Sequence, residues 1–127
     1  MSNKPKILYV DDEEINITVF QLTFSKVFEV LTADSGAKGV EIFNSDPDIK
    51  FVISDMRMPA MNGLEFIRKI KNVCEHIPCS ILSGYQQSPE ILSALDNGEI
   101  VEYLMKPFNK GAIEELILKH VNGVAGN

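Results

Sequence analysis

The chain alternates five times between a short apolar run and a longer segment with helical periodicity. In the first run, residues 7–10, the apolar residues are consecutive, which is typical of a strand that is buried on both faces. We expect strands at residues 7–10, 28–32, 51–54, 79–82 and 100–105. The alternation of the second run is weak, which suits a strand at the edge of a sheet. Strands joined by helices predict an α/β fold, with a single doubly wound five-stranded parallel sheet and helices on both faces.

The longer segments begin at residues that commonly start helices. The first, residues 13–26, has acids in its first turn, where the helix dipole favours them. The residues expected to cap the later helices are Ser35, Asn62 (with Glu65 in a capping box), Ser88 (followed by Pro89) and Asn109. The apolar positions at helical spacing are Ile15, Val19 and Leu22; Ala37, Val40 and Phe43; Leu64, Ile67 and Ile70; Ile91, Leu92 and Leu95; and Ile113, Leu116, Ile117 and Val121. We expect the last helix to end at Asn122-Gly123.

Composition fits one globular domain and excludes several classes of protein. Of the 127 residues 45% are apolar, and the two cysteines, Cys74 and Cys79, match no zinc or disulfide pattern. The net charge of −6 argues against direct nucleic-acid binding, and no apolar stretch is long enough for membrane insertion. No signal peptide is visible, so we expect a cytoplasmic protein. One domain should occupy residues 1–127, with its core at about 6–121 and no output domain in this chain.

Reactive side chains follow the ends of four predicted strands. Asp11 and Asp12 follow the first strand, Asp55 the third, Ser83 the fourth and Lys106 the fifth. The carboxyl ends of parallel strands lie at one edge of a sheet, so these side chains should converge. Each has an ordinary explanation by itself, such as turn capping or solvation, but their combination at one edge favours a functional site.

The residue types in this set suggest phosphoryl chemistry. Three carboxylates in one cleft repel each other, and Lys106 neutralises only one of their charges. A divalent cation with oxygen ligands, such as Mg²⁺, would neutralise the others. Asp55 could then attack a phosphoryl group to give an acyl phosphate, while the cation, Lys106 and the Ser83 hydroxyl contact its oxygens.

The chain resembles the receiver domain of two-component response regulators, a flavodoxin-like domain also found in the chemotaxis protein CheY. The matching segments are Val10-Asp11-Asp12-Glu13, Ser54 to Pro59 with Asn62-Gly63, Ser83-Gly84, and Glu102 to Phe108. They extend over nearly the whole chain, from about Lys6 to Val121. The resemblance implies the strand order 2-1-3-4-5. It also implies a signalling domain in phosphorelay signal transduction that only assists its own phosphorylation and dephosphorylation and is not otherwise an enzyme.

The resemblance implies roles for individual residues. Asp55 would accept a phosphoryl group from a sensor histidine kinase or a histidine phosphotransfer protein. Asp12, Asp55 and the Arg57 carbonyl would bind Mg²⁺ (or Mn²⁺), with Asp11 acting through water. Lys106 would hold the phosphoryl group.

Further residues would complete the phosphoryl site and its switch. Ser83 and Tyr103 would form the switch, and a side chain in place of Gly84 would crowd the phosphoryl site. The bond between Lys106 and Pro107 would be cis. A downstream target or output domain would bind through the fourth helix, fifth strand and fifth helix.

Arg57 and Tyr85 are at positions that vary in this family, two residues past Asp55 and Ser83. Both are large, so we expect them to border the phosphorylation site and to slow hydrolysis by excluding the attacking water. Arg57 cannot act as a base at neutral pH, but its charge could instead favour the transition state.

Other functions remain possible at this point. An Mg²⁺-dependent phosphatase with an Asp nucleophile, of the haloacid dehalogenase type, would need a second acid where this chain has Arg57. A flavin-binding electron carrier would need a phosphate loop where this chain has two acids. A pseudo-receiver that only binds partners would have lost an acid or Lys106. A phosphotransfer protein would need an active histidine, and His76 and His120 are more typical of surface groups.

Overall fold

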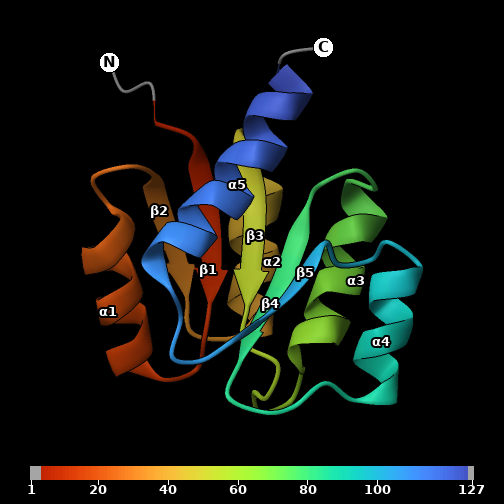
Figure 1. The fold of residues 1–127 in the computed structure, drawn as a ribbon. Helices are drawn as coiled ribbons and strands as arrows, with labels where there is room; N and C mark the ends of the chain where they lie inside the picture. The colour runs from red at the N-terminus through yellow and green to blue at the C-terminus, as the bar shows by residue number, and fades with distance from the viewer. Residues whose placement is uncertain (1–3, 126–127) are drawn as a thin grey trace.

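The computed structural model describes residues 4–125, which form a parallel sheet with helices on both faces (Figure 1). The sheet has five strands in the order β2-β1-β3-β4-β5, which confirms the predicted fold class and places β2 at an edge. The strands are β1 (Lys6–Val10), β2 (Glu29–Ala33), β3 (Ile49–Ser54), β4 (Cys79–Ser83) and β5 (Glu102–Met105). The helices are α1 (Glu14–Phe24), α2 (Gly36–Ser45), α3 (Gly63–Val73), α4 (Pro89–Asp96) and α5 (Lys110–Ala125).

Two apolar clusters, one on each face of the sheet, explain why a central strand such as β1 is almost continuously apolar. In β1, Ile7 and Tyr9 belong to the cluster under α1 and α5, whereas Leu8 and Val10 belong to the cluster under α2, α3 and α4. Successive side chains of a strand point to opposite faces, so a strand covered on both sides needs apolar residues at every position. This confirms the interpretation of the first apolar run.

The buried face of α1 differs from the predicted one. Ile15, Val19 and Leu22 have the expected helical spacing, yet they are 68%, 44% and 78% exposed. Phe20 and Phe24 are fully buried instead. A phenylalanine buries more apolar surface than a branched aliphatic side chain, so the aromatic face packs against the sheet and leaves an apolar stripe in solvent.

Smaller differences concern α2 and α4. Ala37 is exposed, and α2 buries Gly36 and Gly39 instead. A Cβ added at Gly39 would lie 2.6 Å from the Phe66 ring on α3. Leu92 of α4 is 50% exposed, while Ala94 is buried. Close helix packing therefore selects small residues at positions that a hydrophobicity pattern overlooks.

The helix starts follow the sequence closely. Each of the four predicted capping residues accepts a hydrogen bond from a backbone N–H three positions later, and the capping box at α3 is complete; these residues are Ser35, Asn62, Ser88 and Asn109. The end of α5 is different, because the helix runs past Asn122-Gly123 to Ala125. A glycine inside a helix costs about 1 kcal/mol, which does not by itself end the helix. Among residues 4–125, every helix is too short or too polar to span a membrane.

Candidate functional site

Backbone hydrogen bonds fix the predicted site residues at the carboxyl edge of the sheet. Asp55 N–H donates to the Val10 carbonyl at 2.8 Å, directly beyond the last paired residues of β1 and β3. Lys106 N–H donates to the Ser83 carbonyl at 2.8 Å in the same way beyond β4 and β5. These hydrogen bonds continue the ladder of the sheet by one residue, so the backbones of Asp55 and Lys106 are fixed at its carboxyl edge.

Three of these side chains form an acidic pocket. Carboxylate oxygens of Asp11, Asp12 and Asp55 lie within 4.8 Å of one another. Asp11 is fully buried, Asp55 is 7% exposed and Asp12 is exposed. The donors are all hard oxygens and one side of the group is open to solvent, which is the environment that Mg²⁺ prefers with part of its hydration shell retained. These residues fit Mg²⁺, and Mn²⁺ accepts the same oxygen ligands.

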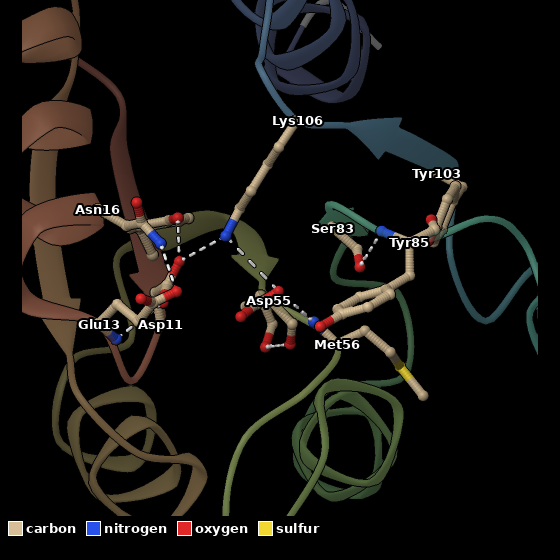
Figure 2. Close-up of polar contacts among 11 residues, drawn as sticks. Asp11, Glu13, Asn16, Asp55, Met56, Ser83, Tyr85, Tyr103 and Lys106 are labelled. Carbon is tan, nitrogen blue, oxygen red and sulfur yellow. Dashed lines mark hydrogen bonds and ion pairs between the residues drawn. The ribbon is translucent and has the colours of Figure 1, made fainter.

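Lys106 reaches from the end of β5 into the acidic pocket (Figure 2). Its Nζ lies 3.0 Å from Asp11 Oδ2 and 3.7 Å from Asp55 Oδ1. The ammonium group thus stands between two carboxylates that are 44 positions apart in the sequence. Its charge compensates part of their repulsion. The peptide bond between Lys106 and Pro107 is cis.

The carboxyl group of Asp55 has an unusual acidity. Burial raises the pKa of Asp55 from 3.8 to about 6, and Asp11 and Asp12 add to this increase. The charge of Lys106 and a hydrogen bond from Met56 N–H at 2.9 Å act in the opposite direction. Asp55 is therefore a carboxylate near neutral pH, but one that carries a desolvated and repelled charge. Such a group is suited to accept an electrophile.

Asp11 has a hydrogen-bond partner that the sequence pattern did not reveal. The hydroxyl of Tyr9 donates to Asp11 Oδ2 at 2.7 Å, and Glu13 N–H donates to Oδ1 at 2.9 Å. Tyr9 is 1% exposed, and its place within the first apolar run indicates only a buried strand residue. The only signal in the sequence is a polar atom within an otherwise apolar strand, two residues before an acid.

The loop between β3 and α3 is held close to Asp55 by Gly63. Its N–H donates to the Met56 carbonyl at 2.8 Å, and a Cβ added there would lie 2.2 Å from the Asp55 carbonyl oxygen. In the sequence, Gly63 is part of a segment that resembles the family, and nothing there indicates this close approach of the two backbones. The crowding predicted at Gly84 does not come from the protein, because a Cβ added there would have no heavy atom within 4 Å.

A chain of contacts connects Ser83 with Tyr103 through Tyr85. Ser83 Oγ accepts a hydrogen bond from Tyr85 N–H at 3.2 Å, and the Tyr103 hydroxyl donates to the Tyr85 carbonyl (Figure 2). Ser83 is fully buried and Tyr103 is 8% exposed, so both lie inside the fold. The exposed ring of Tyr85 stacks under the Arg57 guanidinium, whose Cζ is 3.7 Å from the ring centroid.

Among the predicted site residues, the structure brings Asp11, Asp12, Asp55 and Lys106 together most closely. Arg57 and Tyr85 are exposed and line one cleft of about 580 Å³ beside the loop that follows Asp55. The two histidines line a separate groove with Lys50 and Pro78, at the amino ends of β3 and β4. His120 is only partly exposed, because its ring packs edge-on against Phe51 at 5.8 Å.

Comparison with known proteins identifies close similarity over most of the chain. Residues 7–118 match the family model of the response regulator receiver domain. The chain is 34% identical over 120 residues to the transcriptional regulatory protein GlrR of Escherichia coli (strain K12), covering 92% of this chain and 26% of that protein. It therefore spans about a quarter of that relative. The chemotaxis protein CheY1 of Helicobacter pylori (strain J99) is 31% identical, with 87% of this chain and 91% of that protein covered.

A solved structure gives the same result for the fold. The crystal structure of a response regulator receiver domain protein from Clostridium thermocellum superposes with a TM-score of 0.88 at 32% identity, covering 94% of this chain and 96% of that one. The match to the family model extends from β1 into α5 and therefore includes the whole carboxyl edge of the sheet. This chain belongs to the response regulator receiver domain family of two-component systems.

Proposed function

We propose that this protein is a phosphoacceptor in a two-component system. It receives a phosphoryl group on Asp55, and Tyr103 transmits the phosphorylated state to the surface. The observation that carries the proposal is the position of Lys106 Nζ, 3.0 Å from Asp11 and 3.7 Å from Asp55. An ammonium group held between Asp11 and the proposed nucleophile Asp55 is suited to bind phosphoryl oxygens. The protein would assist its own phosphorylation and dephosphorylation without being an enzyme for another substrate.

The transfer involves one bond formed and one bond broken. A carboxylate oxygen of Asp55 attacks phosphorus, the bond from phosphorus to the donor's histidine nitrogen breaks, and that nitrogen keeps the electron pair. Lys106 donates a hydrogen bond to a phosphoryl oxygen, and the Ser83 hydroxyl turns from Tyr85 N–H to donate to another. Asp55 ends as an acyl phosphate.

Asp12, Asp55 and the Arg57 carbonyl would hold Mg²⁺, with Asp11 acting through water. When bound, the ion would supply positive charge to the oxygens of the group being transferred. The acidic pocket supports this role of the ion, because Lys106 is the one ammonium group within residues 4–125 that forms ion pairs with its three carboxylates.

The exposed apolar stripe of α1 would contact the phosphodonor. The stripe consists of Ile15, Val19 and Leu22. It continues into an apolar groove of about 490 Å³ that is lined by Val19, Pro107 and Phe108 and reaches Lys106. A donor must bring its histidine to Asp55, so it covers the neighbouring surface. A helical domain of a sensor kinase or phosphotransfer protein would lay its own apolar face on this stripe.

A downstream target or output domain would bind to the surface of α4, β5 and α5. Tyr103 is on β5 and its hydroxyl contacts the loop that leads into α4, so a change at Ser83 reaches this surface. Leu92 and Met105 are 50% and 47% exposed on α4 and β5 and would form part of the contact.

The phosphatase alternative is less well supported by the geometry. Arg57 occupies the position where such an enzyme would have its second acid, and its guanidinium stacks on Tyr85. Arginine remains protonated at neutral pH and cannot transfer the proton that hydrolysis of an acyl phosphate requires.

Phosphorylation with a small donor tests the proposal. Acetyl phosphate with Mg²⁺ is expected to add one phosphoryl group to the protein, detected by intact mass. The variant Asp55→Asn should remain unlabelled, because it keeps the shape of the side chain without the nucleophile. Asp34→Asn is the matched control, since Asp34 is an exposed acid that pairs with Lys38 away from the site. Equal labelling of Asp55→Asn and wild type would show that the acceptor is another residue.

A further inference from the structure

The hydroxyl of Tyr9 connects the apolar core under α1 with the acidic pocket. It donates a hydrogen bond to Asp11 Oδ2 at 2.7 Å, and the same oxygen accepts a second hydrogen bond from Lys106 Nζ at 3.0 Å. Asp11 is fully buried and Tyr9 is 1% exposed, so the hydrogen bond between them lies in a medium where such a bond is strong and an unpaired charge is costly. One carboxylate oxygen is thus shared by a phenol and an ammonium group.

The ring of Tyr9 is held rigidly. It stacks on Phe20 with 4.0 Å between ring centroids and 5° between planes, and Phe20 packs on Phe24 and Phe108 in turn. This aromatic packing leaves the hydroxyl little freedom to choose another partner. The orientation of the Asp11 carboxylate is therefore set from the core side of β1 as well as by its own backbone.

Packing alone does not require this hydroxyl. A phenylalanine would fill the same position in the apolar cluster and would leave no polar atom to satisfy. Tyrosine instead places a donor at Asp11, the nearer of the two carboxylates that pair with Lys106. Removing the donor would leave a buried carboxylate with fewer hydrogen bonds and free it to rotate towards Lys106.

We propose that Tyr9 is a positioning residue of the acceptor site, whose hydroxyl orients the Asp11 carboxylate both for the divalent cation and for Lys106. It acts through Asp11 and does not itself contact the phosphoryl group. The inference rests on the proposed function for the cation, but its effect on Lys106 does not. Partners that orient metal-binding carboxylates are commonly worth 10- to 100-fold in metal affinity.

The variant Tyr9→Phe tests the proposal in two measurements on the full chain. Mg²⁺ affinity is measured by calorimetry, and we expect it to fall about tenfold in Tyr9→Phe. The Nζ and Cε resonances of Lys106 are measured by NMR in metal-free protein, and we expect them to shift. Ile7→Val is the matched control, because Ile7 is a fully buried residue of the same strand and cluster without a polar atom. It should change neither quantity, although it also destabilises the core.

A double-mutant cycle distinguishes positioning from general loosening of the fold. In an Asp11→Asn background, Tyr9→Phe should change Mg²⁺ affinity less than about twofold, since its effect passes through the Asp11 carboxylate. An equal loss in both backgrounds would overturn the proposal, as would an unchanged Lys106 resonance or an unchanged Mg²⁺ affinity in Tyr9→Phe. Wild-type protein that binds no Mg²⁺ would instead contradict the proposed function, and the Lys106 resonance would then decide the role of Tyr9 alone.

Discussion

The Arg57 guanidinium lies over the face of the Tyr85 ring, with Cζ 3.7 Å from the centroid. The contact joins the loop after β3 to the loop after β4, and so links the segment next to Asp55 with the segment next to Ser83. A cation–π contact at an exposed position contributes about 0.5–1 kcal/mol. The contact between the two side chains is therefore weak enough to open readily.

The first prediction concerns the lifetime of the phosphorylated protein. Hydrolysis of an acyl phosphate needs a water in line with the bond that breaks, and we expect the bulky Arg57–Tyr85 pair to act as a cover that limits the access of this water to Asp55. We expect Arg57→Asn and Tyr85→Ala to lose phosphate faster than wild type, each by about threefold or more if the cover contributes the free energy of one cation–π contact. Decay is followed after removal of the donor.

Tyr85→Phe serves as the control for this cover, because phenylalanine keeps a ring under the guanidinium. Its decay should resemble that of wild type. Slower decay in both Arg57→Asn and Tyr85→Ala would mean that these side chains assist hydrolysis, as a positive charge near the transition state can.

The second prediction concerns the switch. Ser83 Oγ accepts from Tyr85 N–H at 3.2 Å, and the Tyr103 hydroxyl donates to the Tyr85 carbonyl. If Ser83 turns to a phosphoryl oxygen, Tyr85 N–H loses its acceptor and the loop that holds Tyr103 rearranges. Beryllofluoride with Mg²⁺ should therefore shift NMR resonances of Ser83, Tyr85, Tyr103 and α4. Changes confined to the acidic pocket at saturation would contradict this pathway.

The third prediction follows from the raised pKa of Asp55. The folded protein binds this proton more tightly than the unfolded chain, since the pKa rises from 3.8 to about 6. The charge therefore lowers stability above about pH 6, and this cost is relieved as the pH falls towards 4. Metal-free Asp55→Asn should be more stable than wild type at neutral pH by roughly 1–3 kcal/mol.

Urea unfolding in the presence of a chelator measures this difference. The advantage of Asp55→Asn should shrink as the pH falls from about 6 towards 4, because the folded wild-type protein then takes up the proton and loses the buried charge. A difference that stays constant over this range would show that the variant acts by packing rather than by removing a buried charge.

The fourth prediction concerns Gly63. A Cβ at this position would lie 2.2 Å from the Asp55 carbonyl oxygen and 3.0 Å from Ile81 Cδ1. Gly63→Ala should destabilise the fold by about 1–3 kcal/mol and slow phosphorylation, because the loop that carries Asp55 must move. Chemical denaturation and labelling with acetyl phosphate measure the two effects. Gly84→Ala, where no heavy atom lies within 4 Å, should leave the unfolding free energy nearly unchanged.

The fifth prediction concerns the apolar stripe of α1. Leu22 is 78% exposed, so Leu22→Ser should hardly affect stability. If a protein donor docks on this stripe, the variant should slow transfer from a phosphorylated donor by about tenfold while labelling by acetyl phosphate stays the same. Leu92→Ser on α4 is the control, since Leu92 is 50% exposed on another surface and should not affect transfer. Equal transfer rates for wild type and Leu22→Ser would exclude the stripe as the docking surface.

The sequence by itself determined the elements and the edge at which the chemistry gathers. Consecutive apolar residues marked the strands, and Ser35, Asn62, Ser88 and Asn109 marked the helix starts, because burial on both faces and capping are properties of short segments. Parallel strands then require that the residues after them share one edge. The meeting of Asp11, Asp55 and Lys106 follows from this rule without any knowledge of side-chain contacts.

Only the tertiary structure decided which side of α1 is buried. The aliphatic stripe and the pair Phe20 and Phe24 both have helical spacing, and a periodic pattern cannot choose between two faces of one helix. The choice depends on aromatic partners from β1 and the segment after β5, namely Tyr9 and Phe108. The aliphatic stripe is left outside because the aromatic face buries more apolar surface.

The close contacts around Asp55 also depend on the third dimension. The Tyr9 hydroxyl reaches Asp11, the Gly63 backbone approaches Asp55, and Arg57 stacks on Tyr85 because strand register and loop path bring these atoms within a few ångströms. The sequence alone does not determine the distance between the polar atoms of two side chains on one strand, or between groups on separate loops. Which atoms touch is set by side-chain direction and packing, and these are known only when the whole core is assembled.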